Sequence, residues 1–263
     1  MAEAPCRERG NGQKASGQLS VGLKIARLLY QPYKWLVFIP LLCFYTIVLG
    51  GLAIILASLF NARLAMKLAG NPWARLNCLT IPVPVTVRNR HNIIPGQSYV
   101  VVSNHQSLVD ILVIAGWLGI DIRWVAKASL RNVPVFGPAS AKMEHIFIDR
   151  SNARAARETI SNARKNITNG TSVMFFAEGT RSTDGSLKAF KSGAFRMALD
   201  LGVPVLPVTV RGTRKILPPG SMKLFPGRAE IVVHPQIETG FFSQETMGDL
   251  VEKTRSAIGS ALP

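Results

Sequence analysis

"SYVVVSNHQSLVDILVIAGWLGIDIRWVA", residues 98–126, places a helix-like segment between two strand-like ones. Residues 98–103 and 121–126 are rich in β-branched side chains, which strands favour. Residues 107–118 between them carry apolar side chains at helical spacing. A strand, a helix and a strand in immediate succession are typical of an α/β domain.

The same alternation continues along the rest of the chain. Helical patterns lie at 190–201, from Ala153 to Ile167 and from Met247 to Ile258. We therefore predict an α/β sandwich with a central mixed or largely parallel sheet flanked by helices. The length of 263 residues allows one such domain and an appendage that need not share its core. The further strand-like runs are VPVTV (83–87), HIFID (145–149), SVMFFA (172–177), VPVLPVTV (203–210) and AEIVVH (229–234).

The first 80 residues differ in character from this alternation. Residues 1–20 are polar and lack an apolar face, so we expect a disordered tail there. Residues 36–60 contain no charged side chain over 25 positions, about the length that crosses a bilayer core. The flanking segments mix Leu, Ile and Trp with Lys and Arg, as interfacial helices do. We predict a hydrophobic helical membrane anchor over residues 21–80, followed by the α/β domain over residues 81–263.

The uncharged run has three interpretations. As a single span, it would place the domain outside the cell, because the basic residues before it favour a cytoplasmic N-terminus. Alternatively, Pro40 and the Gly50–Gly51 pair divide the run into arms of about ten residues, which enter one leaflet without crossing it. A buried helix of a soluble protein is the third possibility. We favour the monotopic anchor.

The chain is strongly basic, with a formal net charge of +16. Such a charge requires an anionic partner, and nucleic acid, anionic lipid and phosphorylated substrates all qualify. Aromatic residues make up only 8% of the chain and no cluster of aromatic and basic residues is present, which argues against nucleic acid. A basic membrane-surface protein without catalytic activity remains an alternative.

The cysteines and the known short motifs exclude several other classes. Cys6, Cys43 and Cys78 lie far apart, and none forms a C-x-x-C pair, so neither a disulfide framework nor a zinc site is indicated. The zincin, P-loop, dinucleotide-binding and serine-hydrolase motifs are all absent. We therefore expect no metal and no cofactor.

His105 and Asp110 are the residues in the opening stretch that are best able to act as catalytic groups. Ser107 begins an S-x-x-D pattern, so a capping box with Asp110 explains the acid without any catalytic role. His105 precedes that cap, at a strand-to-helix turn where α/β sheets commonly bind ligands. Across a turn, Asp110 can accept the Nδ1 proton of His105 and leave Nε2 as a base.

Four blocks in the chain resemble those of one enzyme family. NHQSLVD (104–110) resembles the H-x-x-x-x-D block of glycerolipid acyltransferases, and HIFIDR (145–150), FFAEGTRS (175–182) and VPVLPV (203–208) follow in the family's order. The segment VAKASLRNVPVFG (125–137) is also similar. The best resemblance is to bacterial 1-acyl-glycerol-3-phosphate acyltransferases of the PlsC type. Glu144 and Ala177 depart from the family pattern, which has Gly and Pro there.

The resemblance implies acyl transfer from acyl-CoA or acyl-ACP to the sn-2 hydroxyl of lysophosphatidic acid. His105 would be the base and Asp110 its partner. Glu178 would orient Arg181 or the glycerol hydroxyls, and VPVLPV would form a wall of the acyl groove. His145 is expected at a strand end or on the surface. The remaining residues implied to bind the phosphate are Arg150, Gly179, Thr180, Arg181 and Lys127.

The resemblance also implies where the enzyme acts. The product would be phosphatidic acid, made at the cytoplasmic face of a bacterial-type inner membrane. The anchor and the basic surface would both hold the domain at an anionic bilayer. Another lysolipid, such as lyso-ornithine lipid, is an alternative acceptor for the same fold.

Overall fold

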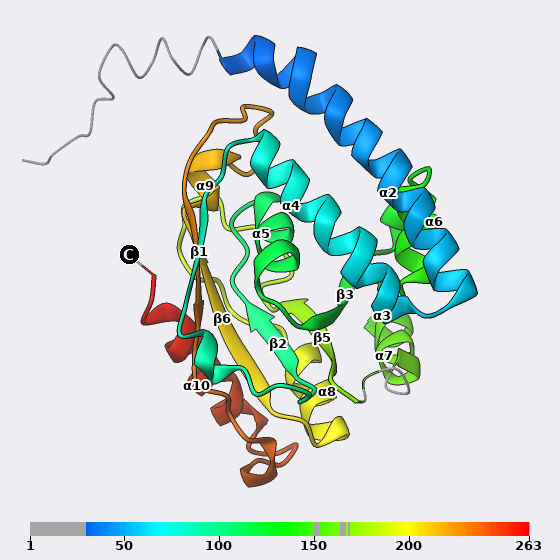
Figure 1. The fold of residues 1–263 in the computed structure, drawn as a ribbon. Helices are drawn as coiled ribbons and strands as arrows, with labels where there is room; N and C mark the ends of the chain where they lie inside the picture. The colour runs from blue at the N-terminus through cyan, green and yellow to red at the C-terminus, as the bar shows by residue number, and fades with distance from the viewer. Residues whose placement is uncertain (1–29, 150–152, 164–166, 168, 263) are drawn as a thin grey trace, which may run out of the picture.

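The computed structural model describes residues 30–149, 153–163, 167 and 169–262 (Figure 1). Within these residues, the strands form one seven-stranded sheet in the order β1-β7-β6-β2-β5-β3-β4. Each strand overlaps one of the β-branched runs of the sequence. The strands are β1 (Val85–Arg88), β2 (Val100–Ser103), β3 (Asp121–Lys127), β4 (Ile146–Ile148), β5 (Thr171–Phe176), β6 (Val205–Arg211) and β7 (Ala229–Val233).

The sheet is mixed and largely parallel, as predicted. Strands β6, β2, β5, β3 and β4 run parallel to one another, β7 is antiparallel to β6, and β1 is parallel to β7. Val100 of the central strand β2 pairs with Val205 on one side and Val173 on the other. All four residues of β2 are buried, as expected for a parallel strand covered on both faces.

Helices cover both faces of this sheet (Figure 1). Helices α2, α4 and α5 pack on one face, and α7, α8 and α10 contribute to the core on the other. The longer helices are α2 (Ile39–Leu59), α4 (Asn71–Thr80), α5 (Val109–Trp117), α7 (Ala153–Ala163), α8 (Gly193–Leu201) and α10 (Met247–Gly259). The shorter helical segments are η1 (Lys34–Phe38), α3 (Ala62–Ala65), η2 (Met66–Gly70), η3 (Arg90–Asn92), η4 (Ala128–Asn132), α6 (Phe136–Lys142), α9 (Thr213–Ile216) and η6 (Thr239–Phe241).

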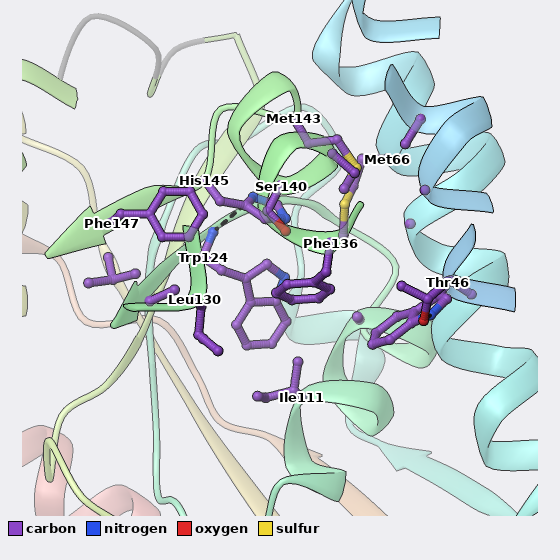
Figure 2. Close-up of a pocket in the computed structure, with 18 of the residues that line it drawn as sticks. Thr46, Met66, Ile111, Trp124, Leu130, Phe136, Ser140, Met143, His145 and Phe147 are labelled. Atoms are coloured by element: carbon purple, nitrogen blue, oxygen red, sulfur yellow. Dashed lines mark hydrogen bonds between the residues drawn. The ribbon is translucent and has the colours of Figure 1, made fainter. Parts of the chain in front are cut away.

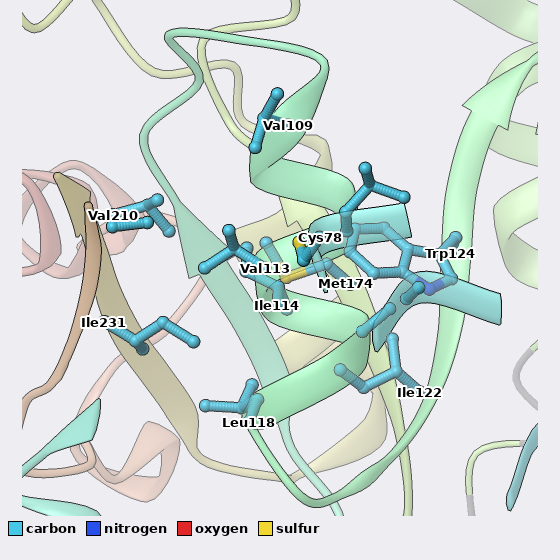
Figure 3. Packing of buried hydrophobic residues seen from close by; sticks show 14 of the residues in the cluster. Cys78, Val109, Val113, Ile114, Leu118, Ile122, Trp124, Met174, Val210 and Ile231 are labelled. Carbon is cyan, nitrogen blue, oxygen red and sulfur yellow. The ribbon is translucent and has the colours of Figure 1, made fainter. Parts of the chain in front are cut away.

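Helix α5 lies in the middle of one core, between the sheet and α4. Val113 and Ile114 are fully buried, as is Cys78 of α4, and all three belong to one cluster with Ile231 of β7 (Figure 3). A helix buried on several sides needs apolar residues around most of its circumference, which α5 has. Because Cys78 belongs to this cluster, α4 shares a core with the sheet.

The predicted break in the uncharged run is wrong. Residues Tyr30–Leu59 form one continuous helix through Pro40 and both glycines. Pro40 lies in the first turn of α2, directly after the π-helical turn η1, where the wider backbone tolerates a missing N–H. Gly50 is a packing contact, since a Cβ there would lie 2.6 Å from Val135 Cγ1. The glycine therefore lets α2 approach the start of α6.

Tyr30–Leu59 is, among the described residues, the one helix long and apolar enough to cross a membrane, judged by length and composition. It packs against α4 and α6 along its course (Figure 1). Of the most apolar 18-residue stretch of this helix, only 6% is buried in the protein, which does not fit the buried-helix alternative. The predicted tail over residues 1–20 lies outside the described residues. The large exposed apolar side chains between residues 30 and 60 are Trp35, Leu36, Val37, Phe44, Ile47, Val48, Leu52, Ile55, Leu59 and Phe60.

Candidate active site

His105 and Asp110 meet in the turn that joins β2 to α5. His105 Nδ1 lies 2.9 Å from Asp110 Oδ2. Because β2 ends at Ser103 and α5 begins at Val109, the turn brings together two side chains that a continuous helix would separate. The contact expected from the five-residue spacing is therefore present.

Asp110 is fully buried, and its carboxylate accepts hydrogen bonds from other groups besides the imidazole of His105. Its Oδ2 also accepts the N–H groups of Gln106 at 2.7 Å and Ser107 at 2.8 Å. The hydroxyl of Thr213, at the start of α9, donates to Oδ1. One carboxylate thus closes the turn and orients His105, which combines the two interpretations that the sequence left open.

The predicted capping box is only half formed. The N–H of Ser107 donates to Asp110 as expected. Ser107 Oγ, however, accepts the N–H of Val109 at 3.2 Å and donates to the carbonyl of Leu217 at 2.8 Å. The N–H of Asp110 donates instead to the carbonyl of Ser107 at 3.3 Å, because the first turn is tight and closes between residues i and i+3.

The rest of the fold fixes both the ring and the backbone of His105. Its ring stacks on Phe176 of β5, with ring centroids 3.9 Å apart and planes 12° apart. Its N–H donates to Glu178 Oε1 at 2.8 Å, and its carbonyl accepts the N–H of Ser182 at 2.8 Å. Within the described part of the chain, Nε2 is the ring nitrogen without a hydrogen-bond partner, and the side chain lines a cavity.

Glu178 accepts hydrogen bonds from backbone N–H groups rather than from Arg181. Its two oxygens accept the N–H groups of His105 and of Lys188, the latter at 3.1 Å. Burial raises the pKa of Glu178, while these hydrogen bonds act in the opposite direction. The predicted contact with Arg181 is wrong, because both oxygens point toward the backbone of two loops. Glu178 therefore connects the loop after β5 to the turn that carries His105.

The residues predicted to bind phosphate are only partly brought together. Arg181 and Lys127 line the same cavity as His105. Arg150 lies outside the described residues. Lys188 Nζ, which the sequence did not single out, lies 3.4 Å from Thr180 Oγ1 and donates to the carbonyl of Arg181 at 2.9 Å. A cationic group therefore lies beside the third block.

Gly179 has a different role from the one predicted for it. Its φ of +72° is the left-handed conformation that favours glycine, and its N–H donates to the carbonyl of Phe176 at 3.0 Å. That N–H closes the turn after β5, so it does not face an anion. The left-handed backbone of this turn explains why a glycine occupies position 179.

The cavity beside His105 has a volume of about 310 Å³. Thr46 of α2, Trp73 of α4, Trp124 of β3 and Phe136 of α6 belong to its wall, which is mostly apolar (Figure 2). Helices α2, α4 and α6 thus form one apolar space together with strand β3. The arrangement suits an aliphatic chain.

Of two expectations that bear on this cavity, one is wrong and one is confirmed. VPVLPV does not contribute to its wall, because Val205, Leu206 and Val208 are fully buried inside the sheet as part of β6. His145 was expected at a strand end or on the surface. It directly precedes β4 and is half-buried, so the strand-end expectation is confirmed. Its side chain also lines the cavity, because the chain reverses between α6 and β4 (Figure 2).

Some functional candidates had no recognisable signal in the sequence. Thr213 lies 103 residues after Asp110, and nothing in the spacing connects them. Phe176 belongs to the third block but was assigned only to a strand. Among the described residues, no group of three or more His, Cys, Asp or Glu side chains could hold a metal ion.

Comparison with known proteins agrees with this geometry. The acyltransferase family model matches residues 84–211, which contain His105, Asp110 and Arg181. A 1-acyl-sn-glycerol-3-phosphate acyltransferase of Chlamydomonas reinhardtii is 32% identical over 91% of this chain and 70% of its own length. The chain belongs to the 1-acyl-sn-glycerol-3-phosphate acyltransferase family. A chloroplastic relative from Brassica napus shares 39% identity over 52% of this acyltransferase and 40% of its own length.

A solved structure extends the similarity to most of this acyltransferase. The 1-acyl-sn-glycerophosphate acyltransferase PlsC of Thermotoga maritima matches it with a TM-score of 0.72 and 28% identity. The match covers 91% of this chain and 99% of the other. It therefore extends well beyond residues 84–211, which the family model matches.

Proposed function

We propose that this acyltransferase moves an acyl group from acyl-CoA or acyl-ACP to the sn-2 hydroxyl of 1-acyl-glycerol-3-phosphate, giving phosphatidic acid. One observation carries the proposal: the His105–Asp110 pair lies in the wall of an apolar cavity that also includes Arg181. An aliphatic chain, a base and a cation for phosphate can then meet in one place.

The chemistry assigned to His105 is general base catalysis. Nδ1 is held by Asp110, so Nε2 takes the proton of the acceptor hydroxyl as its oxygen attacks the thioester carbonyl. The C–S bond then breaks, and the thiolate takes the proton back from His105. The buried carboxylate of Asp110 stabilises the imidazolium that exists between these steps.

No cysteine nucleophile is proposed. Cys43 is exposed on α2, and burial raises the pKa of Cys78 to about 12, which keeps that thiol protonated. Neither belongs to the wall of the cavity that contains His105. Direct transfer from thioester to hydroxyl is therefore the simpler route.

The acceptor phosphate is assigned to the cations around the third block. Arg181 is the first candidate, since a guanidinium can bind phosphate oxygens with two parallel hydrogen bonds. Arg150, Lys127 and the Thr180 hydroxyl complete the proposed set, and Lys188 Nζ donates to the Thr180 hydroxyl and to the carbonyl of Arg181. Gly179 and Glu178 contribute indirectly. Gly179 closes the turn after β5, and Glu178 accepts the backbone N–H groups of His105 and Lys188.

Purified protein, labelled lysophosphatidic acid and each thioester donor provide the direct test. We expect labelled phosphatidic acid with at least one donor, and much slower turnover with lysophosphatidylcholine or lyso-ornithine lipid, which lack a terminal phosphate. Equal turnover of acceptors with and without that phosphate would contradict the proposed acceptor. A failure to acylate any lysolipid would contradict the enzyme assignment for this chain.

Thr213 is proposed as a positioning residue for Asp110. Thr213→Val removes the hydrogen bond to Oδ1 and leaves a buried carboxylate oxygen unpaired, which costs about 1.5–3 kcal/mol for a charged group. We expect a lower thermal midpoint and about tenfold lower kcat with little change in KM. Thr213→Ser keeps the hydroxyl and should restore both quantities. A Thr213→Val variant with normal kcat would show that Asp110 does not need this contact.

The proposed location is the cytoplasmic face of a bacterial-type inner membrane, with α2 lying in one leaflet. Support comes from the exposed apolar side chains of Tyr30–Leu59 and from its packing along α4 and α6, which a perpendicular span would not allow. Helix α2 also gives Thr46, Leu49 and Gly50 to the cavity wall. Removing it would therefore damage the site as well as the anchor.

Cysteine labelling of intact spheroplasts tests this orientation without truncation. One cysteine is placed at position 10 and another at position 261, in a variant that lacks Cys6, Cys43 and Cys78. A membrane-impermeant maleimide should label neither site before lysis and both after it. Labelling at position 261 in intact spheroplasts would place the active site outside and contradict the cytoplasmic assignment.

A further inference from the structure

Polar side chains are few in the cavity wall away from the catalytic residues. Thr46 is one, but its hydroxyl already donates to the carbonyl of Leu42 at 2.6 Å and accepts Trp73 Nε1 at 3.0 Å. Two others, close together in the wall, are Ser140 of α6 and His145, just before β4. These two have hydrogen-bonding capacity that the protein does not use.

Ser140 and His145 lie together where the chain reverses. The N–H of His145 donates to the carbonyl of Ser140 at 3.0 Å, which joins the end of α6 to the start of β4. Figure 2 shows both side chains at the same end of the cavity, beside Trp124. Ser140 is only 3% exposed, so its hydroxyl can meet little except what occupies this space.

The position of the ring proton of His145 can be assigned. His145 Nδ1 accepts a long hydrogen bond of 3.5 Å from the N–H of Trp124, so the ring proton is on Nε2. Burial, and to a smaller degree the Arg123 cation, lower the pKa of His145 to about 3, so the ring stays neutral. Within the described part of the chain, neither Nε2 of His145 nor the Ser140 hydroxyl has a partner.

We infer that Ser140 and His145 form a subsite for a hydroxyl group on the aliphatic chain that the cavity binds, an inference that rests on the proposed acyl transfer. Ser140 is buried and His145 is half-buried. Buried polar groups in folded proteins nearly always have a partner, so the unpaired hydroxyl of Ser140 beside the His145 ring indicates a polar ligand atom. A hydroxyl fits both groups at once. It accepts the Nε2 proton of His145 and exchanges a hydrogen bond with Ser140. A chain without a hydroxyl group would leave both unpaired.

The subsite makes a prediction about chain selectivity. The donor arm uses lysophosphatidic acid without a hydroxyl on its chain as the acceptor. It compares kcat/KM for palmitoyl-CoA with kcat/KM for each of a series of monohydroxypalmitoyl-CoA isomers. The acceptor arm places the hydroxyl on the chain of lysophosphatidic acid instead. We expect one isomer, or two adjacent ones, in one arm to exceed the unsubstituted chain by about fivefold or more, the effect of one or two neutral hydrogen bonds.

Variants assign that preference to the two side chains. In Ser140→Ala and His145→Phe, the ratio of hydroxylated to plain substrate should fall to about one. Met143→Leu changes the same wall without a polar atom and should leave the ratio unchanged. Ser140→Ala deletes a single oxygen, so it decides the question even if His145→Phe folds poorly after Trp124 loses its acceptor.

Two results would overturn the subsite. One is equal turnover of plain and hydroxylated chains by the unsubstituted protein at every position tested. The other is a preference that survives in Ser140→Ala. Turnover of palmitoyl-CoA itself tests the underlying acyl transfer separately, because it requires no contact with Ser140 or His145.

Discussion

His105→Ala should lower kcat by at least roughly 100-fold, the lower end of what a general base contributes. The variant lacks the nitrogen that removes the acceptor proton, while the apolar cavity and Arg181 remain in place. KM for lysophosphatidic acid should therefore change little. Initial rates with palmitoyl-CoA, measured across acceptor concentrations, separate the two quantities.

The structure indicates that this variant still folds. Both backbone contacts of residue 105, to Glu178 and to Ser182, are independent of its side chain. Asp110 would keep the N–H groups of Gln106 and Ser107, so the turn stays closed. The thermal midpoint should fall by only a few degrees, mainly from the lost stacking on Phe176.

A second histidine serves as the control for His105. His91 is exposed in the segment between β1 and β2, away from the cavity, so His91→Ala should keep normal turnover. If a folded His105→Ala protein turned over at nearly the normal rate, His105 could not be the base. Another group in the cavity would then have to take the proton.

The sheet could be predicted from the sequence because its signal is local. Each strand is a short β-branched run whose neighbours in the chain are polar or glycine-rich, and burial on both faces makes such runs nearly continuous. The His105–Asp110 contact was also local, since five residues and one turn separate the two side chains. Such features need no knowledge of distant packing.

The cavity could not be predicted in this way. Its wall combines Gly50, Trp73, Trp124 and Phe136 from separate helices and a strand, and their proximity depends on how those elements pack. VPVLPV looked like a groove wall because it is apolar, but apolarity alone does not distinguish a cavity from the interior of a sheet. Pro40 and the glycines likewise indicated a break that packing on α6 overrides.

Asp110→Asn should lower kcat by roughly 100-fold or more while leaving the fold nearly intact. Three donors, from His105, Gln106 and Ser107, converge on Oδ2. An asparagine can place its carbonyl oxygen there and turn its NH₂ toward Thr213, whose hydroxyl can also accept. Nδ1 of His105 would keep its proton, so the turn and the tautomer survive.

What the asparagine lacks is the negative charge beside the imidazolium. A buried, water-excluded carboxylate stabilises that cation far more than an amide does, so the loss should appear in kcat rather than in stability. Nitrogen-15 NMR of His105 can verify that the proton stays on Nδ1, and thermal unfolding can verify the fold. If Asp110→Asn kept normal kcat but unfolded several degrees earlier, Asp110 would serve only to close the turn before α5, and the paired-base mechanism would be wrong.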